Sequence, residues 1–217
     1  MTNMVSWDSS IRVFLQQAGS PAPTPGGGSV AALIAALGAS MATMVGNLSQ
    51  GGKYAPIQPQ IVEVIEMMAS LTTECEELHH ADITCFNYYM EALKLPKVTD
   101  EEALIRNQAI HEAAIHAIDV PLRLIEVCKA GIICTHRIAE SSNKNVISDL
   151  GIGAILFEAA AQSASLTVEI NLNSLQDLLL KRQYASKLSL WISEIENLKN
   201  ETLQIARNRI MHGDATT

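Results

Sequence analysis

The sequence predicts an all-α protein, a multi-helix bundle with long helices, on three observations. The 217-residue chain is 48% hydrophobic but only 4% aromatic, so Ala, Leu, Ile, Val and Met must build the core, and most of these residue types favour helices. In the long apolar stretches, hydrophobic residues recur at steps of three and four, the helical period. Stretches with the alternation typical of strands are hard to find. The length and the lack of a low-complexity linker predict one domain over residues 1–217.

The predicted helices follow one another with clear breaks between them. An amphipathic helix over 5–18 ends before a proline run that cannot continue it. An alanine-rich helix over 28–48 and a long helix over 58–93 follow. Thr99 and the acidic residues after it resemble a helix-capping start, and the next helix, reaching residue 139, must kink or break at Pro121. Ser148 and Asp149 open a helix that runs to residue 172, and a last amphipathic helix spans 175–211.

Two of these helices exceed about 30 residues, or about 45 Å. That is long for one globular domain of this size. Helices of such length usually bury their faces along a bundle or against a partner subunit. We therefore expect a homodimer.

The alanine-rich helix carries no charge, and no charged residue lies between Arg12 and Lys53. Its length is close to the roughly 20 residues that a membrane span needs. However, it consists mostly of Ala, Gly, Ser, Thr and Met, which drive insertion weakly, and no aromatic belt or basic flank borders it. A helix that is apolar on all sides is otherwise one buried inside a protein. We expect a core helix and no membrane contact.

Charge, cysteines and histidines exclude several classes of function. The formal net charge is −8, and no block of Lys and Arg provides a nucleic-acid surface. The four cysteines show no C-x-x-C spacing, which argues against zinc clusters and a disulfide framework. In HEAAIH, residues 111–116, the histidines are five apart rather than the four that a helical zinc site needs. The N-terminus lacks a secretory pattern. We expect a cytoplasmic protein without a metal site.

Two local features are candidates for a site. The glycines Gly26, Gly27 and Gly28 with Ser29 stand at the entrance of the uncharged helix, where bare backbone N–H groups can face an anion or an electron-rich ring. The alternative is a turn in which Ser29 caps the helix. Asp82 has apolar neighbours along its predicted helix, so its carboxylate must be paired, exposed or functional.

Several motifs recur along the chain in a fixed order. The segment PAPTPGGGSVAALIAALGASMATMVGNLS begins at Pro21, and Gly52-Lys53-Tyr54 follows it. Then come Asp82-Ile83-Thr84-Cys85-Phe86, ALKLPK from Ala92, Arg106, Val120-Pro121, residues 143–151 (NKNVISDLG) and Val168-Glu169-Ile170-Asn171-Leu172. This order resembles the cyclodeaminase module of the formiminotransferase-cyclodeaminase family, which includes stand-alone methenyltetrahydrofolate cyclohydrolases. Two positions depart from the family pattern: Thr167 replaces an asparagine, and Cys85 replaces an alanine.

The resemblance implies a folate one-carbon enzyme that acts on the N5–N10 bridge of tetrahydrofolate. As a cyclohydrolase it would add water to the methenyl carbon and form 10-formyltetrahydrofolate. As a cyclodeaminase it would close a formimino group onto N10 and release ammonia. The absence of a formiminotransferase domain from the sequence tilts the choice toward the cyclohydrolase. Neither reaction needs a metal or redox cofactor, so we expect none. The alternative is a catalytically inactive relative that binds folate or serves as a helical dimerisation subunit.

The resemblance also implies roles for particular residues. Asp149 and Asp82 would share the proton transfers, with Ser148 and Asn145 orienting water or the pterin. The backbone of residues 26–29 would lie against the folate. Candidate contacts for a glutamate tail of one or more residues are Lys53 and Arg106, with Lys94, Lys97 and Lys144; for each lysine the alternative is a solvated surface position. On local grounds Ser148-Asp149 is a plain helix cap. We expect both carboxylates to meet in one cleft.

Overall fold

The structure is a computed structural model that describes residues 6–212. Its helices are α1 (Ile11–Ala18), α2 (Gly27–Asn47), α3 (Gln58–Lys94), α4 (Asp100–Arg137), α5 (Ile147–Leu172) and α6 (Leu178–His212). Short 3-10 turns, η1 (Gly52–Ile57) and η2 (Lys144–Val146), precede α3 and α5. Within residues 6–212 no strand is present. The prediction of an all-α fold is confirmed.

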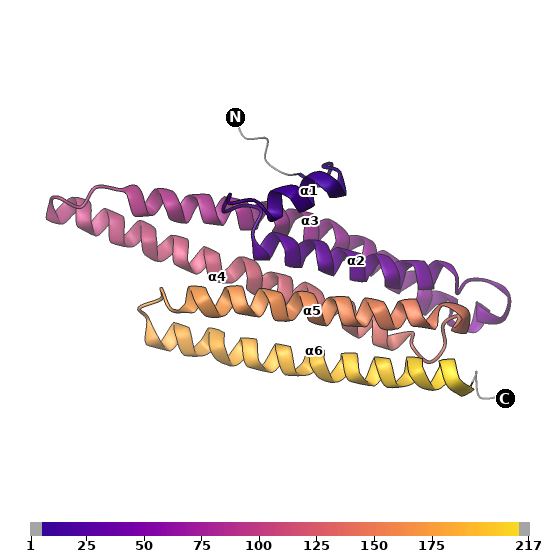
Figure 1. Ribbon diagram of the computed structural model, residues 1–217. Coiled ribbons are helices and arrows are strands. Elements are labelled where there is room, and N and C mark those ends of the chain that lie inside the picture. The colour runs from indigo at the N-terminus through magenta and orange to yellow at the C-terminus, as the bar shows by residue number, and fades with distance from the viewer. Residues whose placement is uncertain (1–5, 213–217) are drawn as a thin grey trace.

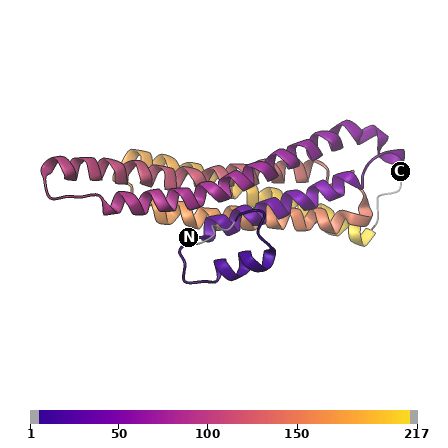
Figure 2. The same ribbon diagram turned by 90° about the horizontal axis from the view of Figure 1, so that it is seen from above.

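The long helices lie side by side in an elongated bundle (Figure 1). α2 packs against α3, α4 and α5, and α6 covers α4 and α5. The hairpin of α3 and α4 extends beyond the turn that joins α5 to α6, while α1 lies on the outside of the bundle (Figures 1 and 2). α2 is much shorter than α3, so its N-terminus lies part of the way along the bundle (Figure 1).

α2 and α5 approach closely because their contact faces are made of small residues. A Cβ atom on Gly38 would lie 3.2 Å from the carbonyl oxygen of Gly153, and one on Gly153 would lie 3.1 Å from that of Gly38. Ala31, Ala35 and Ala39 of α2 are fully buried. By length and composition alone, Gly27–Asn47 and Lys144–Leu172 could each cross a membrane, but 56% and 50% of their apolar windows are buried inside the bundle. This burial is what a core helix requires.

Several helix boundaries differ from those predicted. α1 begins at Ile11 rather than residue 5, because Ser10 caps it by accepting a hydrogen bond from Val13 N at 3.3 Å; Val5 lies outside the described residues. α6 begins at Leu178 rather than residue 175, where Asp177 Oδ1 accepts hydrogen bonds from the first turn. The capping start at Thr99 is confirmed.

Of the kink or break predicted at Pro121, the break is absent, because α4 runs through Pro121 as one helix. The cap predicted for α5 is wrong. At the start of α5 the capping position is Val146, and Ser148 and Asp149 lie inside the first turn without capping it.

Candidate active site

The N-terminus of α2 is capped by a carboxylate from another helix. Gly26, at the capping position, supplies no side chain. Instead Asp82 of α3 accepts hydrogen bonds from Ser29 N at 2.9 Å and from Ser29 Oγ at 2.8 Å, both on Oδ2. The partial positive charge of a helix N-terminus stabilises a negative charge there. Ser29 therefore serves α2 by binding Asp82, and not as the capping residue of the alternative interpretation.

Gly28 is the residue that lets Asp82 come so close. A Cβ atom at Gly28 would lie 2.2 Å from Asp82 Oδ1 and 2.6 Å from its Cγ. Gly27, one residue earlier, is exposed, and a Cβ there would meet nothing within 4 Å. Of these two glycines, only Gly28 is required sterically, and the reason is the carboxylate.

A pocket of about 160 Å³ begins at Asp82, in the space between α3, α4 and α5. From α3 its lining side chains follow the helical period: Asp82, Cys85, Phe86 and Tyr89. The remainder are Ala117, Val120 and Pro121 of α4 and Thr167 and Asn171 of α5. Three of the ordered sequence motifs, which lie far apart along the chain, therefore converge on one cavity, and Asp82 is the carboxylate that lines it.

Pro121 and Asn171 come from two different motifs, and Asn171 supplies the hydrogen bond that Pro121 cannot make. Proline has no N–H, so it leaves the carbonyl four residues earlier, that of Ala117, without its helical donor. Asn171 Nδ2 donates to this oxygen at 2.7 Å. The side chain of α5 thus replaces the missing bond, which is why α4 continues through the proline instead of breaking.

Cys85 lies within the pocket, and its thiol ionises less readily than that of an ordinary cysteine. Burial, together with the charges of Asp82 and Asp119, raises the pKa of Cys85 above its ordinary value. A thiol with a raised pKa stays protonated at neutral pH, and only the thiolate is reactive. Cys85 and Thr167, the two departures from the family pattern, line the same cavity.

Most of the other predicted site residues lie at the opposite end of α2. Asn143 N donates to Ser49 Oγ at 2.8 Å, and Asn143 Nδ2 donates to Leu48 O at 2.8 Å. These bonds fix the start of α5, with Asn145 and Asp149, beside the C-terminus of α2. The predicted residues at this end are Asn145, Ser148 and Lys53, all exposed, and the half-buried Asp149.

Asp82 and Asp149 therefore do not meet within one chain. Gly153 contacts Gly38, Met41 and Ala42, and because α5 runs antiparallel to α2, Asp149 lies one turn further along, level with about Val45. From Ser29 to Val45 the rise of 1.5 Å per residue gives a separation of about 24 Å. The expectation that one chain brings both carboxylates into one cleft is wrong, because the register of α5 against α2 sets them apart.

Arg106 belongs to neither end of α2. It lies on α4 near the tip of the α3–α4 hairpin, where Nη2 donates to Leu93 O at 3.4 Å. Fourteen residues separate it from Val120 in the pocket, or about 21 Å along the helix. Lys94, at the same tip, is exposed and pairs with Glu91 at 2.6 Å. Leu93 lies four residues, or about 6 Å, beyond Tyr89 of the pocket lining, so Arg106 is near the hairpin-tip end of the pocket and far from the Val120 wall.

Tyr89 is a pocket residue that sequence reasoning missed. It follows Asp82 by seven residues, so it lies on the same face of α3 as Asp82, Cys85 and Phe86. That spacing was a usable signal. Asn171 and Pro121 were noticed only as parts of motifs, and nothing local indicated that they touch the same carbonyl.

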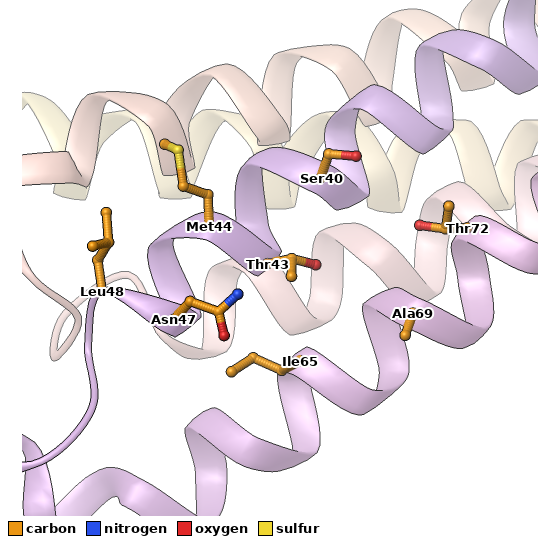
Figure 3. A pocket seen from close by; sticks show the side chains of 8 residues that line it. All are labelled: Ser40, Thr43, Met44, Asn47, Leu48, Ile65, Ala69 and Thr72. Carbon is orange, nitrogen blue, oxygen red and sulfur yellow. The ribbon is translucent and has the colours of Figure 1, made fainter.

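An open groove runs along the C-terminal half of α2, from Ser40 to Leu48. It measures about 640 Å³ and lies between α2 and α3. Figure 3 labels its lining: Ser40, Thr43, Met44, Asn47, Leu48, Ile65, Ala69 and Thr72. None of these side chains is charged, and the hydroxyls of Ser40, Thr43 and Thr72 donate to carbonyls of their own helices. The groove is thus mainly apolar.

Comparisons with known proteins agree with the motifs. The family model described as formiminotransferase-cyclodeaminase matches residues 10–190. A methenyltetrahydrofolate cyclohydrolase of Methylorubrum extorquens is 34% identical over 202 residues, which cover 93% of this chain and 97% of the relative. The formimidoyltransferase-cyclodeaminase of Rattus norvegicus is 32% identical over 86% of this chain but only 35% of its own length.

A solved structure shows the same fold. The crystal structure of formiminotetrahydrofolate cyclodeaminase from Thermotoga maritima superposes with a TM-score of 0.84 and 25% identity, over 94% of this chain and 98% of that one. Sequence motifs, family model and fold agree over nearly the whole chain. The chain belongs to the formiminotransferase-cyclodeaminase family.

Proposed function

We propose that the chain is a folate one-carbon enzyme acting on the N5–N10 bridge of tetrahydrofolate, and that it works as a methenyltetrahydrofolate cyclohydrolase. Family membership supports the substrate class. The relative from Methylorubrum extorquens, matched almost from end to end, bears the cyclohydrolase name, and the Thermotoga maritima structure, matched over a similar share, bears the cyclodeaminase name. The higher identity to the first supports the hydrolytic reaction.

The observation that carries this proposal is the Asp82 carboxylate at the N-terminus of α2, lining the pocket in which three motifs converge. Both hydrogen bonds from Ser29 end on Oδ2, so Oδ1 is the oxygen placed to accept a proton. In the hydrolysis, water attacks the methenyl carbon and loses a proton to a general base. The bond from that carbon to N5 then breaks: N5 takes the electron pair and a proton, the hydroxyl on the carbon loses its proton as the C=O forms, and the formyl group stays on N10. Asp82 is the proposed base.

Asp149 enters this proposal through a second copy of the chain. The outer face of α2 is uncharged and only partly covered: Leu37 is 48% exposed and Leu48 is 50% exposed. A two-fold axis crossing α2 near Leu37, midway between Ser29 and Val45, would bring the Asp82 end of one copy to the Asp149 end of its partner, because a two-fold interface uses the same patch twice. The homodimer would also fill the groove of Figure 3 and assemble Asn145, Ser148 and Lys53 beside the pocket.

The size of the pocket also supports a shared site. Its 160 Å³ is below the roughly 300–1,000 Å³ of ordinary small-molecule sites. A tetrahydrofolate would need the wall of a second chain. The same observation favours the second candidate, a catalytically inactive relative that binds folate or only dimerises. Thr167 and Cys85, which narrow or alter the pocket, would then mark a site that no longer turns over.

One assay separates these functions. The purified protein is given 5,10-methenyltetrahydrofolate, and loss of its near-ultraviolet band is followed; formimino substrate is then tested for appearance of the same band. Hydrolysis faster than the background supports the cyclohydrolase, and formation of the band with ammonia supports the cyclodeaminase. Folate binding without either reaction would support the second candidate, a catalytically inactive relative that binds folate.

Mixing two inactive variants tests the shared site. Asp82→Asn and Asp149→Asn should each lose turnover. If each site takes Asp82 from one copy and Asp149 from the other, random mixing gives half heterodimers, each with one intact site, and about a quarter of wild-type activity. A site contained in one chain would show no recovery.

We further propose a cytoplasmic enzyme that uses no metal, redox cofactor, membrane or nucleic acid, which the net charge of −8 and the chemistry of the reaction support.

A further inference from the structure

The turn between α4 and α5 carries the second half of the proposed site. The last carbonyls of a helix have no donors of their own, so the end of α4 and residues 138–146 need partners from elsewhere. Asn145 and Asp149 follow directly. Whatever holds this turn therefore sets where the Asp149 carboxylate lies.

Arg209, near the end of α6, supplies two of those partners. Its Nη1 donates to Ala139 O at 2.6 Å and its Nη2 donates to Ser142 O at 2.7 Å. A guanidinium group can serve two acceptors at once because its donors form a rigid planar fork. Its positive charge also lies where the C-terminus of α4 is partly negative, which strengthens the contact.

The opposite side of the turn is tied to α2. Asn143 bonds to Leu48 O and Ser49 Oγ, and Ser49 Oγ donates onward to Val45 O at 2.7 Å. Asn143 Oδ1 also accepts from Asn145 N at 3.1 Å. The turn is therefore held between α2 on one side and α6 on the other, and Asn145 is fixed through Asn143.

The part of α6 that makes this contact lies beyond the family match, which ends at residue 190. α6 continues to His212, and its last turns lie beside the start of α5 (Figure 1). A Cβ atom on Gly151 would lie 3.3 Å from Leu203 Cδ2 and 3.6 Å from Ala206 Cβ, so α5 and α6 are closely packed here. This segment supports the site from beyond the residues that the family model matches.

We propose that Arg209 is a positioning residue for the reaction: it holds the α4–α5 turn so that Asn145 and Asp149 keep the geometry that turnover needs. The inference rests on the proposed role of Asp149. Arg209 touches no substrate in this scheme and acts by holding the turn.

The test uses the full-length Arg209→Ala variant in the methenyltetrahydrofolate assay. A displacement of about 1 Å can cost as much as 100-fold in rate, so we expect kcat per folded protein to fall at least about tenfold, with KM changed less than about threefold. Guanidinium chloride at low millimolar concentration, far below denaturing levels, should restore part of kcat by refilling the vacated space. Arg209→Lys should retain an intermediate rate, because one ammonium group cannot match the planar fork.

Arg207→Ala is the matched control. Arg207 is an exposed arginine in the same turn of α6, and its removal should leave kcat unchanged with or without guanidinium. Wild-type kcat in Arg209→Ala would overturn the proposal. So would a loss that follows the unfolded fraction measured by circular dichroism and does not respond to guanidinium, since that loss is one of stability only.

Asp149→Asn, measured in parallel, separates this inference from the proposed function. An active Asp149→Asn variant would refute the role of Asp149, and with it the reason for positioning the turn. An inactive Asp149→Asn variant beside a fully active Arg209→Ala variant would refute the positioning role alone.

Discussion

The two ends of α2 differ in how they hold an acidic side chain. At the N-terminus, Asp82 is fixed directly by the helix, through two hydrogen bonds from Ser29. At the C-terminus, Asp149 has no such bond in its first turn, and its place depends on the turn that Asn143 and Arg209 hold. Asp82 is therefore held by its own hydrogen bonds, whereas Asp149 is held indirectly, by the hydrogen bonds that fix the α4–α5 turn before it. A single substitution near Asp82 should therefore cause a large loss of activity, whereas a single substitution near Asp149 should cause a smaller one.

The largest effect is expected from Gly28→Ala. The new methyl group would lie 2.2 Å from Asp82 Oδ1, so the carboxylate must leave the helix N-terminus. We expect a loss of activity of about 100-fold, as for a misplaced catalytic group, and a loss of about 1–3 kcal/mol in the free energy of unfolding from overpacking. Steady-state kinetics and urea denaturation measure the two quantities.

Gly27→Ala is the stability control for this prediction. Its methyl group meets nothing within 4 Å, and alanine is a better helix former than glycine. Its free energy of unfolding should stay level or rise slightly. If Gly28→Ala behaved like Gly27→Ala in both measurements, the direct placement of Asp82 would be refuted.

The next effect concerns the pocket wall at the Asp82 end. Asn171→Leu leaves the Ala117 carbonyl without a donor, which should cost about 1–3 kcal/mol. In a Pro121→Ala background, the restored N–H of residue 121 can bond to that carbonyl, so the same substitution should cost less. A double-mutant cycle of urea denaturation curves measures the difference, and equal costs in the two backgrounds would show that the two residues are not coupled.

A smaller and more gradual effect is expected at the other end. Ser49→Ala removes the acceptor for Asn143 N, at a cost of about 1 kcal/mol, and should lower kcat a few-fold by loosening the turn before Asp149. Ser163→Ala is the matched control, because the Ser163 hydroxyl bonds only within its own helix, to Ala159 O. Ser49→Ala kinetics identical to those of Ser163→Ala would contradict the inference that the hydrogen bonds of this turn position Asp149.

The contrast between the ends also explains what the sequence could predict. The bounds of α2 were predicted to within one residue because prolines and glycines mark both of its ends. The continuity of α4 was not, since Asn171, which completes the bond that Pro121 lacks, lies on another helix. The separation of Asp82 from Asp149 depends on the register of Gly153 against Gly38, and no local pattern encodes the register between two uniformly small helix faces.

The smallest effect uses Cys85 as a reporter of the Asp82 charge. Burial contributes most to the raised pKa of Cys85, and Asp82 contributes next. The thiolate fraction at pH 8 should therefore lie below that of an ordinary cysteine, and the rate of alkylation by iodoacetamide should keep rising with pH beyond the ordinary pKa of 9.0, where the rate for an ordinary cysteine begins to level off. Asp82→Asn removes one raising charge, so the Cys85 pKa should fall and alkylation at pH 8 should speed up, by less than the tenfold of one full pKa unit. In the monomer, Asp149→Asn, about 24 Å away in the same chain, should leave the rate unchanged, with peptide mass spectrometry assigning the alkylated site. An equal response to both substitutions would mean that both carboxylates act on the pocket, as they would across the interface of a dimer; dilution until the protein is monomeric should then abolish the Asp149 response and leave that of Asp82.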